Sequence, residues 1–153
     1  MAAHRAMQAD GFTFGLGYRQ GMVWSEYVDD LARARAGLDV PDGLVPATFL
    51  VADVGGEIVG RTSVRHRLDD YLARQGGHIG YGVLAGHRRR GYAIEILRQS
   101  LVVARAAGLG RVLVTCDDDN VASATVIERC GGAFDSIVGD VDTGIPIRRY
   151  WID

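Results

Sequence analysis

The feature that most constrains the fold is a strand, a basic loop, a long helix and a second strand in direct succession. Residues 78–84 have the alternation of a strand, and residues 86–91 form the glycine-bounded sequence Gly-His-Arg-Arg-Arg-Gly. Residues 92–107 then carry apolar side chains at helical spacing, and residues 112–116 are an apolar segment typical of a central strand. This order predicts a parallel βαβ crossover, which is right-handed in nearly all proteins.

The segments on either side of this unit predict further strands and helices. Two helices are expected, at residues 23–36 and 120–130. Four strands are expected in two antiparallel pairs, at residues 47–54, 57–67, 133–138 and 145–152. The whole pattern predicts an α/β fold with a mixed central sheet and helices on both faces.

Length and composition exclude several classes of protein. The chain has 153 residues, which predicts one domain over residues 1–153. Its 17 Lys and Arg against 19 Asp and Glu give a net charge of −2, which argues against a nucleic-acid partner. No apolar run is long enough to cross a membrane and residues 1–10 lack a signal core, so a cytoplasmic protein is expected. Cys116 and Cys130 form no CxxC pair, so we expect neither a disulfide framework nor a metal site.

The basic loop predicts an anion-binding site. A helix that begins at Tyr92 would present free N–H groups and the positive end of its dipole to the loop. Gly91 would allow close approach of the backbone, and three arginines precede it. The chain has neither GxxxxGK[ST] nor GxGxxG, which excludes the two familiar nucleotide-phosphate motifs. The alternative is a solvated basic loop that only caps the helix.

The sequence Arg88-x-x-Gly91-x-Ala93 resembles the R/Q-x-x-G-x-G/A signature of the GNAT superfamily of N-acetyltransferases. Asn120 follows Gly91 by 29 residues and opens a predicted helix that closes before Gly131, which is similar to the second motif of that family. The resemblance extends over residues 47–138, and residues 61–72 with 77–81 resemble one bacterial branch. It implies a fold with a parallel βαβ cofactor unit, acetyl-CoA as the co-substrate and an amine acceptor.

The resemblance also implies roles for particular residues. The end of the strand would pair by its backbone with the pantetheine arm, and the loop and helix start would hold the pyrophosphate. Asn120 would bond to the pantetheine and Ser123 would lie near it, although an N-cap and a packed helix residue are the alternatives. The residues expected to bind the cofactor are Tyr81, Gly82, Val83, Arg88, Arg89, Arg90, Gly91, Tyr92, Ala93, Ile94, Asn120 and Ser123.

The chain departs from the family at two catalytic positions. Ile127 stands where many members carry a tyrosine acid, and Thr115 stands where some carry a glutamate base. The acid is dispensable because a thiol with a pKa of ~8.5 can leave as a thiolate. His78 is the best candidate for the base and His66 the second, since an imidazole suits proton transfer near neutral pH. The alternative for His78 is a residue that bonds neighbouring backbone and holds the strand.

Three residues of the preceding strand are candidates for acceptor binding. Arg61 and Arg65 lie at even spacing and therefore face one side, with His66 next to them. If that side is the cleft, they would bind a substrate carboxylate; if it is the outer face, they are a solvated stripe.

The sequence therefore predicts an N-acetyltransferase that moves an acetyl group from acetyl-CoA to the primary amine of a small molecule or peptide. The alternative is a non-catalytic acyl-CoA-binding sensor or scaffold, which the departures at Thr115 and Ile127 favour. A homodimer is plausible because residues 145–152 are expected to form an edge strand.

Overall fold

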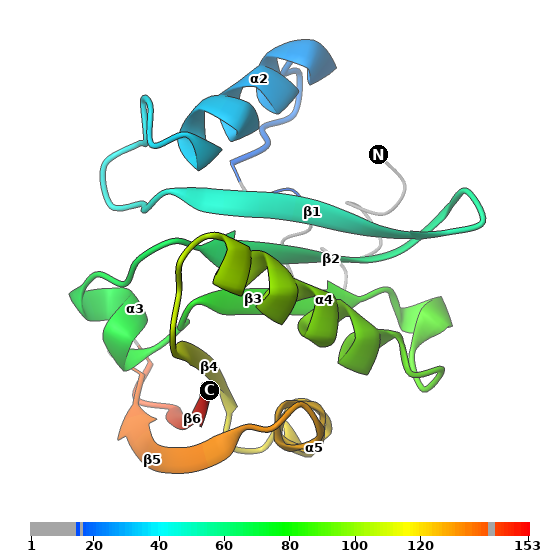
Figure 1. Cartoon of the computed structure of the whole chain (residues 1–153). Helices are drawn as coiled ribbons and strands as arrows, with labels where there is room; N and C mark the ends of the chain where they lie inside the picture. The colour runs from blue at the N-terminus through cyan, green and yellow to red at the C-terminus, as the bar shows by residue number, and fades with distance from the viewer. Residues whose placement is uncertain (1–14, 16, 141–142) are drawn as a thin grey trace.

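A computed structural model describes residues 15, 17–140 and 143–153 of the chain (Figure 1). Its helices are α2 (Trp24–Arg35), α3 (Asp70–Arg74), the 3₁₀ turn η1 (Ala85–His87), α4 (Tyr92–Ala106) and α5 (Val121–Arg129). Its strands are β1 (Ala47–Val54), β2 (Glu57–Arg65), β3 (Ile79–Val83), β4 (Val112–Asp117), β5 (Ala133–Gly139) and β6 (Pro146–Ile152). The expected α/β element order is confirmed.

The strands form two sheets, where the sequence predicts one mixed sheet. One sheet has the order β1-β2-β3 and the other β4-β6-β5, and every pair in both is antiparallel. In Figure 1 the first sheet lies above the second, with the C-terminus beside β6. The strand–helix–strand order of β3, α4 and β4 is present, but within the described residues β3 and β4 form no ladder.

β3 and β4 touch at one end only. The His78 N–H donates to the Leu113 carbonyl over 2.7 Å, and past this point each strand pairs only with its own sheet. β4 is therefore an edge strand, which corrects the prediction that residues 112–116 are central. Its apolar residues are buried because helices and the other sheet pack on it, and not because strands flank both sides.

The first sheet is covered on both faces, as predicted. Alternate side chains of a strand point to opposite faces. The Thr62 hydroxyl accepts a bond of 2.9 Å from Ser100 of α4, whereas the neighbouring Arg61 interacts with Tyr27 of α2. α4 and α2 therefore lie on opposite faces of β2.

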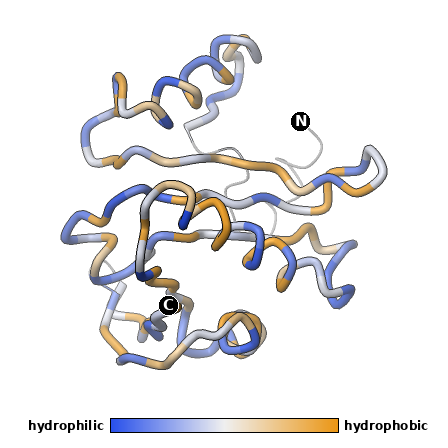
Figure 2. The backbone as a smooth tube through the Cα atoms, viewed as in Figure 1, coloured by the Kyte–Doolittle hydropathy of each residue, from blue (hydrophilic) through white to orange (hydrophobic). Residues whose placement is uncertain are grey.

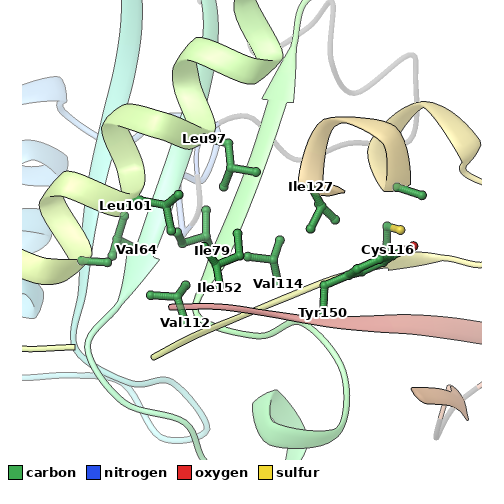
Figure 3. Packing of buried hydrophobic residues seen from close by; sticks show 12 residues of the cluster. Val64, Ile79, Leu97, Leu101, Val112, Val114, Cys116, Ile127, Tyr150 and Ile152 are labelled. Carbon is green, nitrogen blue, oxygen red and sulfur yellow. The ribbon is translucent and has the colours of Figure 1, made fainter. Parts of the chain in front are cut away.

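The main core joins both sheets through α4 and α5 (Figure 3). Leu97 and Leu101 of α4 point toward Val114 of β4 and Ile79 of the first sheet (Figure 3). Leu97 and Val114 are fully buried, and burial of one such side chain contributes about 1.5–3 kcal/mol. This shared core holds the two sheets together although few backbone bonds link them.

β6 lies between β4 and β5 and is therefore not an edge strand. The argument that residues 145–152 offer an edge for a homodimer is wrong, because both sides of β6 are paired. β5 is the other edge strand of this sheet, opposite β4, with Phe134 and Ile137 more than half exposed. Among the described helices none is long and apolar enough to cross a membrane, and hydrophilic and hydrophobic residues alternate along α4 (Figure 2).

Candidate functional site

A cleft of about 880 Å³ opens between the end of β3 and α5, the helix that follows β4. Its walls are the end of β3, the loop and first turn of α4, and one side of α5. The lining residues are Tyr81, Gly82, Val83, His87, Arg88, Arg89, Gly91, Tyr92, Ala93, Ile94, Asn120, Val121, Ala122, Ser123, Thr125, Val126 and Arg129. The structure thus brings together every residue predicted to bind the cofactor except Arg90.

The charged side chains described in the lining of the cleft are all positive. His87, Arg88, Arg89 and Arg129 line it, and none of the described lining residues is acidic. The chain as a whole has a net charge of −2, so this basic lining differs in sign from the protein's overall charge. Such a cleft attracts an anionic ligand.

The loop before α4 presents its backbone to the cleft. Gly91 is the N-cap residue in the left-handed region with φ 86°, and Arg89 also has a positive φ of 63°. The N–H groups of Ile94 and Glu95 bond to the Gly91 carbonyl. Within the described part of the chain, the amides of residues 89–93 donate to no backbone carbonyl. They are therefore available to an anion at the positive end of the helix.

The strand edge forms the floor of the cleft. β3 pairs with β2 on one side, with Gly82 opposite Arg61 and Val83 opposite Gly60. Its other side faces the cleft. The Arg88 side chain folds back over this edge, and its Nε donates to the Val83 carbonyl over 3.2 Å. An extended ligand with amide groups can pair with an open strand edge of this kind.

Asn120 and Ser123 join the two walls of the cleft. Asn120 is the N-cap of α5, and its Oδ1 accepts the Ser123 N–H over 3.0 Å. The Ser123 hydroxyl lies 3.0 Å from the hydroxyl of Tyr81 on β3. Burial raises the pKa of Tyr81 to about 12 and that of the nearby Cys116 to about 11, so both are neutral near pH 7. The cap role of Asn120 is thus confirmed, and its bond to a ligand stays a prediction.

The two positions that depart from the family pattern have structural roles. Ile127 is fully buried in the core, where its methyl group would clash with any side chain at Gly132. The Thr115 hydroxyl accepts the Gly76 N–H over 3.0 Å. Neither side chain lines the cleft.

His78 lies outside the lining of the cleft, directly before β3. It is buried, and its Nδ1 accepts the Leu113 N–H over 2.9 Å. Burial lowers the pKa of its imidazole, and the charge of Arg65 lowers that pKa further. The ring is therefore neutral at pH 7 and bonded to the backbone, which favours a structural role. Its role as a base stays a prediction.

Arg61, Arg65 and His66 also lie outside the lining of the cleft. Arg61 is buried and donates to the Gly80 carbonyl over 3.2 Å, and burial lowers the pKa of its guanidinium to about 10. Arg65 donates to the carbonyls of Gly76 and Gly77 over 2.8 and 3.0 Å. His66 Nε2 lies 2.8 Å from the Thr48 hydroxyl. The two arginines do share one side, but their guanidiniums bind main-chain carbonyls, and carboxylate binding stays a prediction.

Sequence reasoning missed several residues of the cleft. His87 lines it beside the arginines, with its Nε2 3.4 Å from the carboxylate of Glu57, the first residue of β2. One side of α5 also lines it, through Val121, Ala122, Thr125, Val126 and Arg129. Val121, Thr125 and Arg129 are spaced four residues apart and therefore share one side of the helix, but the spacing alone does not show that this side faces the cleft.

Comparison with known proteins identifies the family. A family model described as an acetyltransferase (GNAT) domain matches residues 19–133. A search of curated protein sequences found no significant match.

Several solved structures share the fold. An acetyltransferase from Agrobacterium tumefaciens is 26% identical with a TM-score of 0.62, covering 97% of this chain and 83% of that one. YncA of Salmonella typhimurium, solved with its cofactor acetyl-CoA, is 16% identical with a TM-score of 0.68, covering 99% and 86%. A ribosomal-protein-alanine N-acetyltransferase from Brucella melitensis is 16% identical with a TM-score of 0.67, covering 99% and 91%. With the family model spanning most of its length, the chain belongs to the GNAT acetyltransferase family, whose members are acyl-CoA-dependent N-acyltransferases.

Proposed function

We propose that the cleft binds acetyl-CoA and that the protein transfers the acetyl group to a primary amine. The observation that carries this proposal is the cleft, which combines an open strand edge, unpaired helix amides and four basic side chains. A helix start suits the pyrophosphate of CoA, and a strand edge suits the two amides of its pantetheine arm. The order of these elements along the cleft matches the order of the groups along the ligand.

The chemistry of transfer is a direct displacement. The amine attacks the thioester carbonyl, a C–N bond forms and the C–S bond breaks. A backbone N–H near Val83 would stabilise the negative charge that develops on the carbonyl oxygen. CoA leaves as a thiolate because its thiol titrates near ~8.5, so the buried Ile127 is compatible with turnover.

The acceptor amine must lose a proton during the reaction, and this restricts which amines can react. A lysine amine with a pKa of ~10.4 lies about three units above neutral pH, whereas an α-amine at ~7.7–8.0 is already partly neutral. Water in the open cleft is able to take the proton from the second kind of amine without a positioned base. We therefore expect acceptors whose amine has a low pKa.

The competing proposal is a sensor or scaffold that binds acyl-CoA without turnover. Thr115 and Ile127 favour it, because neither can exchange a proton during the reaction. An assay of CoA thiol release against a panel of primary amines separates the two. The panel should span free amino acids, peptides with free N-termini and lysine analogues, with Gly91→Asp as the matched control for the cleft.

Turnover with at least one amine, abolished in the control, is the expected result. Binding of CoA without turnover over the whole panel would support the scaffold. Failure of the wild-type protein to bind CoA at all would contradict both proposals.

A further inference from the structure

The two sheets meet at a short segment, residues 76–78, that directly precedes β3. The His78 N–H donates to the Leu113 carbonyl over 2.7 Å, and the Gly76 N–H donates to the Thr115 hydroxyl over 3.0 Å. Gly77 has a φ of 59°, and a Cβ at this position would lie 2.5 Å from the Leu113 carbonyl oxygen. Backbone therefore packs directly on backbone here, and a side chain at Gly77 would push the sheets apart.

The His78 ring completes this contact. Its Nδ1 accepts the Leu113 N–H over 2.9 Å, so both main-chain polar groups of Leu113 bond to the same residue. In a continuous sheet, backbone groups of the neighbouring strand would fill these positions. A side chain thus replaces part of a strand pairing where the residue before β3 meets β4.

The cleft begins beyond this contact. Beyond it the two strands form no ladder within the described residues, and the cleft opens over Tyr81 and Val83. On the proposed function of that cleft, we propose that His78 is a positioning residue, whose neutral ring holds Leu113 and so fixes the angle between the sheets and the width of the cofactor cleft. The ring need not touch the cofactor to do this.

The protonation state of the ring decides whether the contact forms. An imidazolium carries N–H groups at both nitrogens and cannot accept from the Leu113 N–H. Around the ring, Arg65 of β2 is the charged group, Trp151 of β6 packs with ring centroids 6.4 Å apart, and β4 contributes its backbone. Burial and Arg65 both lower the pKa of His78, so the contact is present at neutral pH and is lost on acidification.

Three substitutions of His78 test this proposal. Asn carries Oδ1 on Cγ, as His carries Nδ1, so His78→Asn can accept the Leu113 N–H. His78→Gln places its oxygen one bond too far, and His78→Ala has no acceptor. We expect His78→Asn to bind CoA within about threefold of wild type and the other two to bind about tenfold more weakly, the scale of one buried hydrogen bond. Isothermal titration calorimetry gives the affinities, and steady-state kinetics gives kcat at saturating acetyl-CoA.

The pH profile gives a second readout. Wild-type affinity for CoA should fall once the pH drops below the lowered pKa of His78, in the acidic range beneath the ordinary imidazole value, whereas His78→Asn should lack this additional fall. The phosphates of CoA titrate equally in both experiments, so the difference between the two proteins belongs to His78. Ser100→Ala serves as the control, because it removes a buried hydrogen bond between α4 and β2 without touching residues 76–78. It should lower stability but leave CoA affinity unchanged.

The outcomes separate positioning from catalysis. If the His78→Asn, His78→Gln and His78→Ala variants all bind CoA like wild type while kcat falls in all three, His78 is the base and the positioning role is overturned. If the His78→Gln and His78→Ala variants do not fold, His78→Asn and Thr115→Val test the proposal in their place. Thr115→Val removes the second contact at the same segment, the hydrogen bond from the Gly76 N–H. Thr115→Val should weaken CoA binding several-fold, and unchanged binding there would overturn the proposal. Absence of CoA binding by the wild type would overturn the proposed function as well.

Discussion

At the inner wall of the cleft, burial keeps the polar side chains neutral. Tyr81 and Ser123 share a hydrogen bond of 3.0 Å, and burial raises the pKa of Tyr81 to about 12. Cys116 lies in the same environment and its thiol pKa is raised to about 11. The positive charges of Arg88 and Arg89 belong to the loop at the other end of the cleft. The cleft is therefore basic at the loop before α4 and uncharged at its inner wall.

The two cysteines should accordingly be unreactive in the folded protein. Burial raises the pKa of both thiols, so at pH 7.5 the thiolate fraction of Cys116 is about one in a thousand or less. We expect iodoacetamide to label neither residue in the native protein and both after unfolding, as measured by mass spectrometry. A Cys116→Ala/Cys130→Ala variant should keep acetyl transfer. A covalent acetyl-enzyme in the wild type, lost with all activity in this variant, would contradict the direct displacement.

At the scale of elements, two helix starts face the cleft from opposite walls. α4 begins at a left-handed glycine, whereas α5 begins at a side-chain cap, with Asn120 Oδ1 accepting the Ser123 N–H. α4 thus keeps its amides open for an anion, and α5 uses one of its own for stability. The start of α4 therefore offers backbone donors to a ligand, whereas the start of α5 is stabilised by its own side-chain cap.

Substitutions of Asn120 should affect both the stability of the protein and its affinity for CoA. Asn120→Asp retains the cap oxygen but adds a negative charge at the cleft, so stability should stay near wild type while CoA affinity falls about tenfold or more. Asn120→Ala loses the cap and about 1 kcal/mol of unfolding free energy. Thermal denaturation and calorimetric titration measure the two effects. Equal CoA affinity for the Asn120→Asp variant and the wild type would show that Asn120 lies away from the ligand.

The sequence predicted the elements closely and the walls of the cleft only in part. The helix predicted at residues 92–107 is α4 at Tyr92–Ala106, because apolar spacing and the glycines around it fix both ends. The role of Thr125 and Arg129 was missed, since which side of α5 faces the cleft depends on the packing of the second sheet. Short motifs mark the loop, whereas walls built from helix sides carry no motif.

At the scale of the whole molecule, the division into two sheets is the feature that sequence patterns did not predict. Strand periodicity identifies β3 and β4 but cannot show whether they pair. In the structure, Gly77 lies against the Leu113 carbonyl and the His78 ring accepts the Leu113 N–H, contacts that no strand pattern in the sequence indicates. Membership of the GNAT family is confirmed by the family model, while one domain over residues 1–153 and a homodimer stay predictions.

The central claim is that an anionic cofactor binds where the two sheets diverge, on the loop before α4. Gly91 is the best point to test it, because a Cβ there would meet nothing within 4 Å and the packing of the protein is left intact. Its φ of 86° strains most side chains, but Asn tolerates this region and carries no charge. Gly91→Asn therefore controls for the backbone, and Gly91→Asp adds the charge.

Calorimetric titration of acetyl-CoA into the wild type and these two variants is the most direct measurement. The account predicts binding by the wild type, at most about tenfold weaker binding by Gly91→Asn, and a loss of about a hundredfold or more in Gly91→Asp, because its carboxylate faces the pyrophosphate. Wild-type affinity in Gly91→Asp would contradict the account, since the cofactor would then bind elsewhere on the protein.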